Sequence, residues 1–134
     1  MEFTSPTRRN RPGGQVRLIV ADDRERSRRA LRALFSTCPD LVVVGQATDG
    51  AEAIELVARE QPDVAILDLR MPDVDGLEAT ARLKHDWPGV KVLILSHAAE
   101  ARDEALAAGA DAFVAKSDPV DTLLKTVRKL CCTP

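Results

Sequence analysis

Carboxylates stand directly after two short aliphatic runs of the sequence. Asp68 closes the run Val64–Leu67, and Asp22 and Asp23 follow the run Val16–Ala21. An aliphatic run that ends in an acid is typical of a buried parallel strand with the acid at its carboxyl end. Ligands of open α/β sheets bind just beyond that edge, so carboxylates gathered there are suited to a hard cation such as Mg²⁺.

Two further strand-like runs end in residues that suit a phosphoryl group. Ser96 closes one run and offers a hydroxyl donor, and Lys116 closes another and offers a compact cation. With Mg²⁺ to neutralise its oxygens, a phosphoryl donor could be attacked by one carboxylate, which would become an aspartyl phosphate. Taken singly, each residue has an ordinary role as a turn serine, a solvated lysine or a helix cap. The four strand ends together favour a site.

Strand-like and helical patterns alternate from residue 15 onward. The predicted strands are Val16–Ala21, Leu41–Ala47, Val64–Asp68, Val90–Ser96 and Ala112–Lys116. The predicted helices are about Arg24–Thr37, Ala51–Glu60, Leu77–Asp86, Ala99–Ala108 and Pro119–Leu130. Five such repeats predict an α/β fold, a (βα)5 doubly wound five-stranded parallel sheet with the flavodoxin-like strand order 2-1-3-4-5. Its first and third strands are neighbours, which would bring Asp22, Asp23 and Asp68 together.

Composition limits the remaining possibilities. The 134 residues, 45% hydrophobic and 30% charged, fit one globular domain, and we expect that domain over residues 15–134. Residues 1–14 have no periodicity and are interpreted as a disordered or cloning-derived arm. A net charge of −2 argues against a domain that itself binds nucleic acid. No apolar run approaches the roughly 20 residues that span a membrane, and three cysteines without metal-ligand spacing suit a cytoplasmic protein.

From about Val16 to Leu130 the chain resembles receiver domains of two-component response regulators. The resemblance rests on the acidic pair, on the D-x-x-M-P-x-x-x-G pattern of residues 68–76, and on the serine and lysine at the later strand ends. It implies the following site residues: Asp68 as phosphoacceptor; Asp22, Asp23, Asp68 and the backbone carbonyl of Arg70 for Mg²⁺ (or Mn²⁺); and Ser96, Lys116 and Phe113 for phosphoryl binding and switching. Residues 44–50 and 108–113 are similar to the NarL/FixJ (LuxR-type) subfamily.

The resemblance also implies partners and a mechanism. A sensor histidine kinase would phosphorylate Asp68, and the face formed by the fourth helix, fifth strand and fifth helix would change shape. The output would be transcriptional, with DNA contacted only through a C-terminal helix-turn-helix domain absent from this chain. A homodimer is one option and no membrane contact is expected. The domain would be a signalling phosphoacceptor that assists its own phosphorylation and dephosphorylation, and not an enzyme.

Other functions are less consistent with the residues. A stand-alone or phosphorylation-independent pseudo-receiver, used as an interaction module, is the main alternative. A haloacid-dehalogenase-type phosphatase needs D-x-D after its first strand, whereas Asp22 and Asp23 are adjacent. A flavodoxin-like electron carrier needs a phosphate loop there, and these acids would repel a phosphate.

Overall fold

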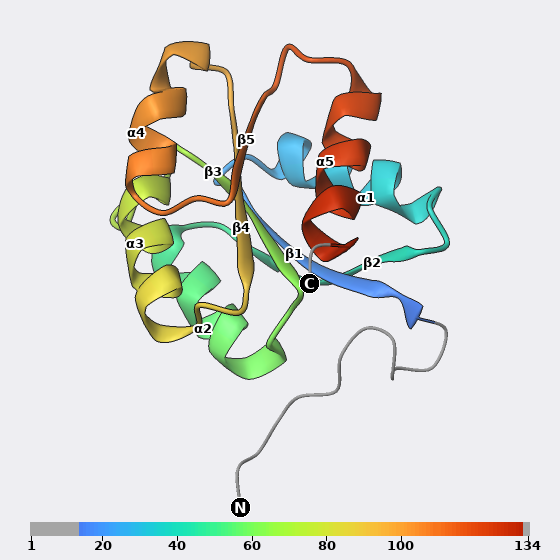
Figure 1. Cartoon of the computed structure of the whole chain (residues 1–134), viewed down its shortest axis with the longest axis horizontal. Coiled ribbons are helices and arrows are strands. Elements are labelled where there is room, and N and C mark those ends of the chain that lie inside the picture. Colours follow the sequence, from blue (N-terminus) through green and yellow to red (C-terminus); the bar gives the residue numbers. More distant parts are fainter. Residues whose placement is uncertain (1–13, 133–134) are drawn as a thin grey trace, which may run out of the picture.

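The computed structural model describes residues 14–132, which form a single twisted parallel sheet between two layers of helices (Figure 1). The strands are β1 Val16–Ala21, β2 Leu41–Ala47, β3 Val64–Asp68, β4 Lys91–Ser96 and β5 Ala112–Ala115. They pair in parallel in the order β2-β1-β3-β4-β5. The predicted fold class and strand order are therefore confirmed.

Helices cover both faces of the sheet. They are α1 Glu25–Ser36, α2 Gly50–Glu60, α3 Gly76–Asp86, α4 Arg102–Ala107 and α5 Val120–Cys132. Figure 1 shows α2, α3 and α4 on one side of the sheet and α1 and α5 on the other. Each side has its own cluster of buried apolar residues, because strand side chains point alternately to the two faces. No helix within residues 14–132 is both long and apolar enough to cross a membrane.

Local sequence explains where the helices on the first side begin and end. The Asp49 carboxylate accepts the backbone N–H of Glu52 at the start of α2, and Asp75 caps α3 through the N–H of Glu78 in the same way. Gly109 follows the C-cap of α4 with a φ of 108°, a left-handed conformation that glycine adopts without strain. Gly109 therefore ends this helix.

One predicted helix differs from the structure. Residues 99–108 were expected to form a single helix, but Ala99–Ala101 form a 3-10 turn (η3) and only Arg102–Ala107 are α-helical. No side chain caps the start of either segment, so the orphan N–H groups there are satisfied by tight i→i+3 bonds such as Ala101 N–H to Ala98 O, 3.0 Å. This short, irregular helix lies next to the carboxyl end of β4.

The predicted arm cannot be compared with the structure, because residues 1–13 lie outside the described part of the chain. The sheet register, however, is described in full. Ala21 of β1 pairs with Leu67 of β3, and Asp68 pairs with Leu95 of β4. The residues that follow β1 therefore leave the sheet beside Asp68, as the strand order predicts.

Candidate functional site

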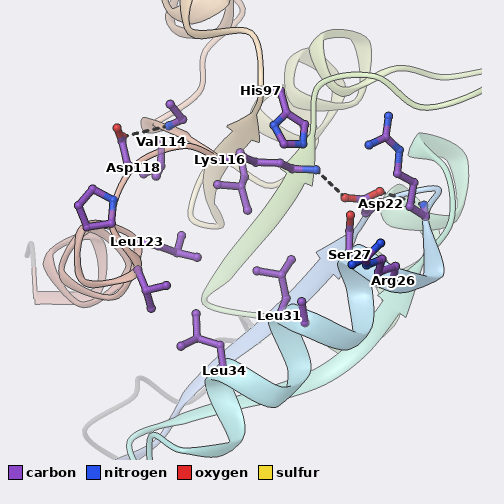
Figure 2. A pocket seen from close by; sticks show the side chains of 16 residues that line it. Asp22, Arg26, Ser27, Leu31, Leu34, His97, Val114, Lys116, Asp118 and Leu123 are labelled. Atoms are coloured by element: carbon purple, nitrogen blue, oxygen red, sulfur yellow. Dashed lines mark hydrogen bonds and ion pairs between the residues drawn. The ribbon is translucent and has the colours of Figure 1, made fainter.

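Asp22 is a buried carboxylate with both oxygens occupied. It is only 1% exposed. Its Oδ1 accepts the backbone N–H of Arg24 at 2.9 Å, which tethers the start of α1, and its Oδ2 accepts Lys116 Nζ at 2.9 Å (Figure 2). Asp22 therefore combines the ordinary role of a turn acid with an ion pair that joins β1 to the end of β5 across the sheet edge.

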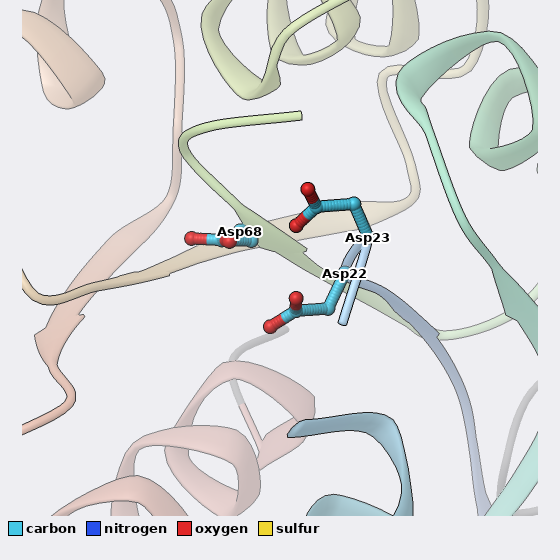
Figure 3. A group of neighbouring side chains, drawn as sticks. All are labelled: Asp22, Asp23 and Asp68. Atoms are coloured by element: carbon cyan, nitrogen blue, oxygen red, sulfur yellow. The ribbon is translucent and has the colours of Figure 1, made fainter. Parts of the chain in front are cut away.

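Asp22, Asp23 and Asp68 gather at the carboxyl ends of β1 and β3 (Figure 3). One carboxylate oxygen from each lies within 4.8 Å of the others, and Asp23 is exposed whereas Asp22 is buried. The strand order predicted from the sequence puts these residues at one end of the sheet, and in the structure they lie close together there. Three carboxylates at this spacing repel one another, so the arrangement favours either a proton or a cation among them.

The pKa of Asp68 is raised above its usual value. Burial is the main cause because it disfavours the charged form, and the negative charges of Asp22 and Asp23 add to it. The ammonium of Lys116, whose Nζ lies 3.8 Å from Oδ2, and the backbone N–H of Arg70 lower the pKa but do not cancel the rise. Asp68 thus has less compensating charge than its neighbour Asp22.

The donor set suits a hard divalent cation. The cluster offers only oxygen ligands, one of its members is open to solvent, and the carboxylates outnumber the ammonium that neutralises them. Mg²⁺ takes one or two carboxylates and keeps several waters, and it suits a solvent-open site of this kind. The residues predicted to bind the metal are therefore compatible with Mg²⁺ or Mn²⁺.

Ser96 lies at the end of β4 and shares a cavity of about 290 Å³ with Asp68. Its side chain is buried, and its Oγ accepts the backbone N–H of Ala98 at 3.0 Å. The hydroxyl proton remains available for a group placed between Ser96 and Asp68. Arg24 and His97 also line this cavity, and neither was assigned to the site from the sequence. Adjacency in the sequence was the signal that could have placed them there, because Arg24 follows Asp23 and His97 follows Ser96.

Phe113 is a core residue on the side of the sheet covered by α2, α3 and α4. It is 8% exposed and pairs with Ile94 of β4, so it stands two strand positions before the level of Ser96 and Ala115. Arg70, in contrast, is exposed at the rim and lines the cavity beside Asp68. Phe113, the candidate switch residue, is therefore buried, whereas Arg70 is exposed at the rim of the cavity.

Gly76 explains the last position of the D-x-x-M-P-x-x-x-G pattern. A Cβ at Gly76 would collide with the backbone carbonyl of Asp68, and the Gly76 N–H donates to Leu69 O at 2.9 Å. The loop after β3 folds back over the strand end at this close approach, which only glycine permits without displacement. The pattern thus fixes the position of Asp68 relative to the start of α3.

Comparisons with known proteins agree with this geometry. The family model described as response regulator receiver domain matches residues 18–128. The response regulator protein VraR of Staphylococcus aureus is 36% identical over 116 residues, which are 85% of this chain and 56% of VraR. The chain thus spans about half the length of the curated relatives it matches.

Two solved structures are similar over nearly their whole length. The signal receiver domain of a response regulator called NarL from Mycobacterium tuberculosis is 33% identical with a TM-score of 0.77, covering 85% of this chain and 97% of the other. A DNA-binding response regulator of the LuxR family from Staphylococcus aureus is 28% identical with a TM-score of 0.80, covering 87% and 98%.

Proposed function

Because the chain belongs to the response regulator receiver domains, of the NarL/LuxR type, and such domains act in two-component signalling, we propose that Asp68 accepts a phosphoryl group from a sensor histidine kinase in the cytoplasm. The observation that carries this proposal is the environment of Asp68. Its pKa is raised, it belongs to a cluster of three carboxylates, and it lines a cavity shared with Ser96.

In the proposed reaction, a carboxylate oxygen of Asp68 attacks the phosphorus of the phosphohistidine. The P–N bond breaks, and the leaving imidazole nitrogen keeps the electron pair. A raised pKa makes this carboxylate more basic than an ordinary Asp side chain, while the Lys116 ammonium lies close enough to attract the incoming phosphoryl oxygens.

We assign the metal to the same residues that the sequence indicated. Asp23, Asp68 and the backbone carbonyl of Arg70 would hold Mg²⁺ or Mn²⁺ directly, and Asp22 would act through water because both of its oxygens already accept hydrogen bonds. When bound, the cation supplies positive charge that neutralises the carboxylates and the phosphoryl oxygens.

The proposed switch uses Ser96 and the segment after it. To bond the phosphoryl group, the Ser96 hydroxyl would turn toward Asp68 and release the Ala98 N–H that its oxygen now accepts. The following segment is the 3-10 turn and the short α4, whose few residues make it a low-stability element able to shift. The face formed by α4, β5 and α5, with Phe113 beneath it, would then report phosphorylation.

The output is also proposed. One of the similar structures is described as a DNA-binding response regulator of the LuxR family, and the matched relatives are about twice as long as the matching region. We infer that this receiver controls a DNA-binding output, with homodimerisation as one means of doing so. The domain itself would be a signalling phosphoacceptor that assists its own phosphorylation and dephosphorylation.

The experiment that tests the proposal is intact-mass analysis after incubation with acetyl phosphate and Mg²⁺. We expect a gain of one phosphoryl group that is lost in Asp68→Asn and in EDTA. The matched control is Asp63→Asn, an acid just before the start of the same strand, which should keep the gain. If Asp68→Asn still gained mass, the acceptor assignment would be wrong. If the wild type gained none, the chain would be a phosphorylation-independent interaction module.

A further inference from the structure

A cleft of about 590 Å³ opens between α1 and α5, on the side of the sheet away from α4 (Figure 2). Leu31 and Leu34 from α1 face Leu123 from α5 across it, and Val114 of β5 also lines it. We call this the α1–α5 cleft. Its volume lies within the roughly 300–1,000 Å³ typical of small-molecule sites, and its lining is mostly apolar.

The cleft is open because small side chains stand where the two helices could meet. Ser27 and Ala30 of α1 are among the residues that line it, and Val120 at the start of α5 remains 56% exposed. Leu31 and Leu34 are only partly buried against the core. Apolar surface that helix packing would normally cover is therefore left accessible to an aliphatic group.

The charges at the mouth of the cleft favour an anion. Arg24 and Arg26 line it and are exposed, and within residues 14–132 their guanidinium groups have neither an ion-pair nor a hydrogen-bond partner. The two acids of the lining are already engaged, since Asp22 accepts Lys116 Nζ and the Arg24 N–H, and Asp118 accepts the Ala115 N–H at 3.2 Å. Positive charge is thus in excess beside the apolar floor.

We propose that the α1–α5 cleft binds a small amphipathic anion, namely an aliphatic chain that ends in one carboxylate. The chain would lie against Leu31, Leu34 and Leu123, and the carboxylate would meet the guanidinium groups of Arg24 and Arg26. Guanidinium groups bind carboxylates through paired hydrogen bonds, and this geometry is more selective than a point charge. The proposal does not depend on phosphorylation of Asp68.

The test is an NMR titration of the ¹⁵N-labelled chain with decanoate, in the absence of a phosphoryl donor. We expect saturable shifts confined to α1, the end of β5 and the start of α5. Decyltrimethylammonium, which has the same tail and the opposite charge, should bind about tenfold more weakly or not at all. Equal affinity of the two probes, or no saturable shift with decanoate, would overturn the proposal.

Substitutions on α1 localise the site. Ala30→Trp should fill the cleft and abolish the shifts, whereas Ala33→Trp, at an exposed α1 position outside the lining, should keep them. Arg26→Gln should weaken decanoate binding severalfold, and Arg32→Gln, also exposed on α1 but outside the lining, should not. Unchanged binding in both Ala30→Trp and Arg26→Gln would place the ligand elsewhere.

A second copy of the chain is the competing occupant. If copies cover the cleft, its resonances will shift with protein concentration and without decanoate, and sedimentation will report a dimer. That result would overturn the small-molecule assignment. Because these measurements use no phosphoryl donor, their failure would leave the phosphoacceptor experiment unaffected, and failure of that experiment would leave the cleft to be judged by decanoate binding.

Discussion

Aspartate residues stand at both ends of the strands, but their surroundings are opposite. We call the side of the sheet where the strands begin the amino edge and the side where they end the carboxyl edge. At the amino edge, Asp63 precedes β3 and Asp111 precedes β5, and each accepts a backbone N–H from a neighbouring strand. Arg17 N–H donates to Asp63 at 2.8 Å, and Val92 N–H donates to Asp111 at 2.8 Å. The Lys84 ammonium adds an ion pair to Asp111 at 2.9 Å. These carboxylates complete the hydrogen bonding of the fold.

At the carboxyl edge there are fewer positively charged donors than carboxylates. Asp22, Asp23 and Asp68 share one ammonium, Lys116, which binds Asp22 closely and Asp68 only at 3.8 Å. What distinguishes the two edges is thus the balance between carboxylates and donors, and not the presence of acids at strand ends. A satisfied acid stabilises the sheet, whereas an acid short of positive charge is available to a cation or a phosphoryl group.

We expect the largest effect on stability from removal of Lys116, the ammonium that these carboxylates share. Lys116→Met leaves the buried Asp22 carboxylate without its ion pair, and breaking a buried pair typically costs about 3 kcal/mol. We expect a loss of that size in urea unfolding without metal, and Mg²⁺ should restore more stability to this variant than it adds to the wild type, because the competing cation is gone.

Lys125→Met is the matched control, because Lys125 is exposed on α5 and takes part in no ion pair within the described chain. It should change the free energy of unfolding by less than about 0.5 kcal/mol. If Lys116→Met lost equally little free energy of unfolding, the carboxyl edge would lack positive charge no more than the amino edge does.

The amino edge is tested by Asp111→Ala. This change leaves the Val92 N–H, at a fully buried residue, without its acceptor and removes one partner of Lys84. A hydrogen bond to a charged group is worth roughly 1.5–3 kcal/mol, so we expect a loss of about 2 kcal/mol in urea unfolding that Mg²⁺ does not restore.

Glu55→Ala, at an exposed position of α2 with no hydrogen bond or ion pair within residues 14–132, provides the reference for removing a carboxylate. Its effect should be near zero. Recovery of Asp111→Ala in Mg²⁺ would indicate that the amino edge also binds the cation, and the contrast between the edges would fail.

The sequence was sufficient for the parts of this contrast that depend on periodicity. Val64–Asp68 was predicted to the residue, because a continuous aliphatic run ending in an acid has few alternatives. Strand order then followed from the rules for βα units, and it placed Asp22, Asp23 and Asp68 at one edge.

The sequence was not sufficient for contacts set by side-chain reach. Lys116 was predicted to serve the phosphoryl group, but its principal bond is to Asp22, 94 residues away. The division of residues 99–108 into a 3-10 turn and α4, and the cleft left by Ser27 and Ala30, also depend on how neighbouring elements pack. The local sequence pattern contains no information about such long-range contacts.

The smallest effect that we expect is a change in stability on substitution of Asp68. Its sign, a gain or a loss, is the most informative of these results. Burial and the neighbouring carboxylates raise the pKa of Asp68 in the folded chain above its usual value near 3.8. The folded chain therefore binds this proton more tightly than the unfolded chain, so the ionised carboxylate lowers stability as pH rises through that range. At pH 7 in EDTA, Asp68→Asn should be more stable than the wild type by about 1 kcal/mol, the scale of a like-charge interaction at this distance. The gain should disappear as pH falls below the usual Asp value, where the carboxyl group is neutral in both states.

Mg²⁺ should reverse the order of stability. A ligand that binds only the folded state at ten times its Kd adds about 1.4 kcal/mol, and Asp68→Asn should lose most of that gain because it removes a carboxylate ligand. Asp63→Asn, at the amino edge, should show no gain in EDTA, because its oxygen accepts the Arg17 N–H, and Mg²⁺ should stabilise it as much as the wild type, because the cluster of Asp22, Asp23 and Asp68 is intact. Unfolding curves at pH 7 with EDTA and with Mg²⁺ decide the matter. If Asp68→Asn were less stable than the wild type in EDTA, the Asp68 carboxylate would have enough donors after all, and the two edges would differ in position only.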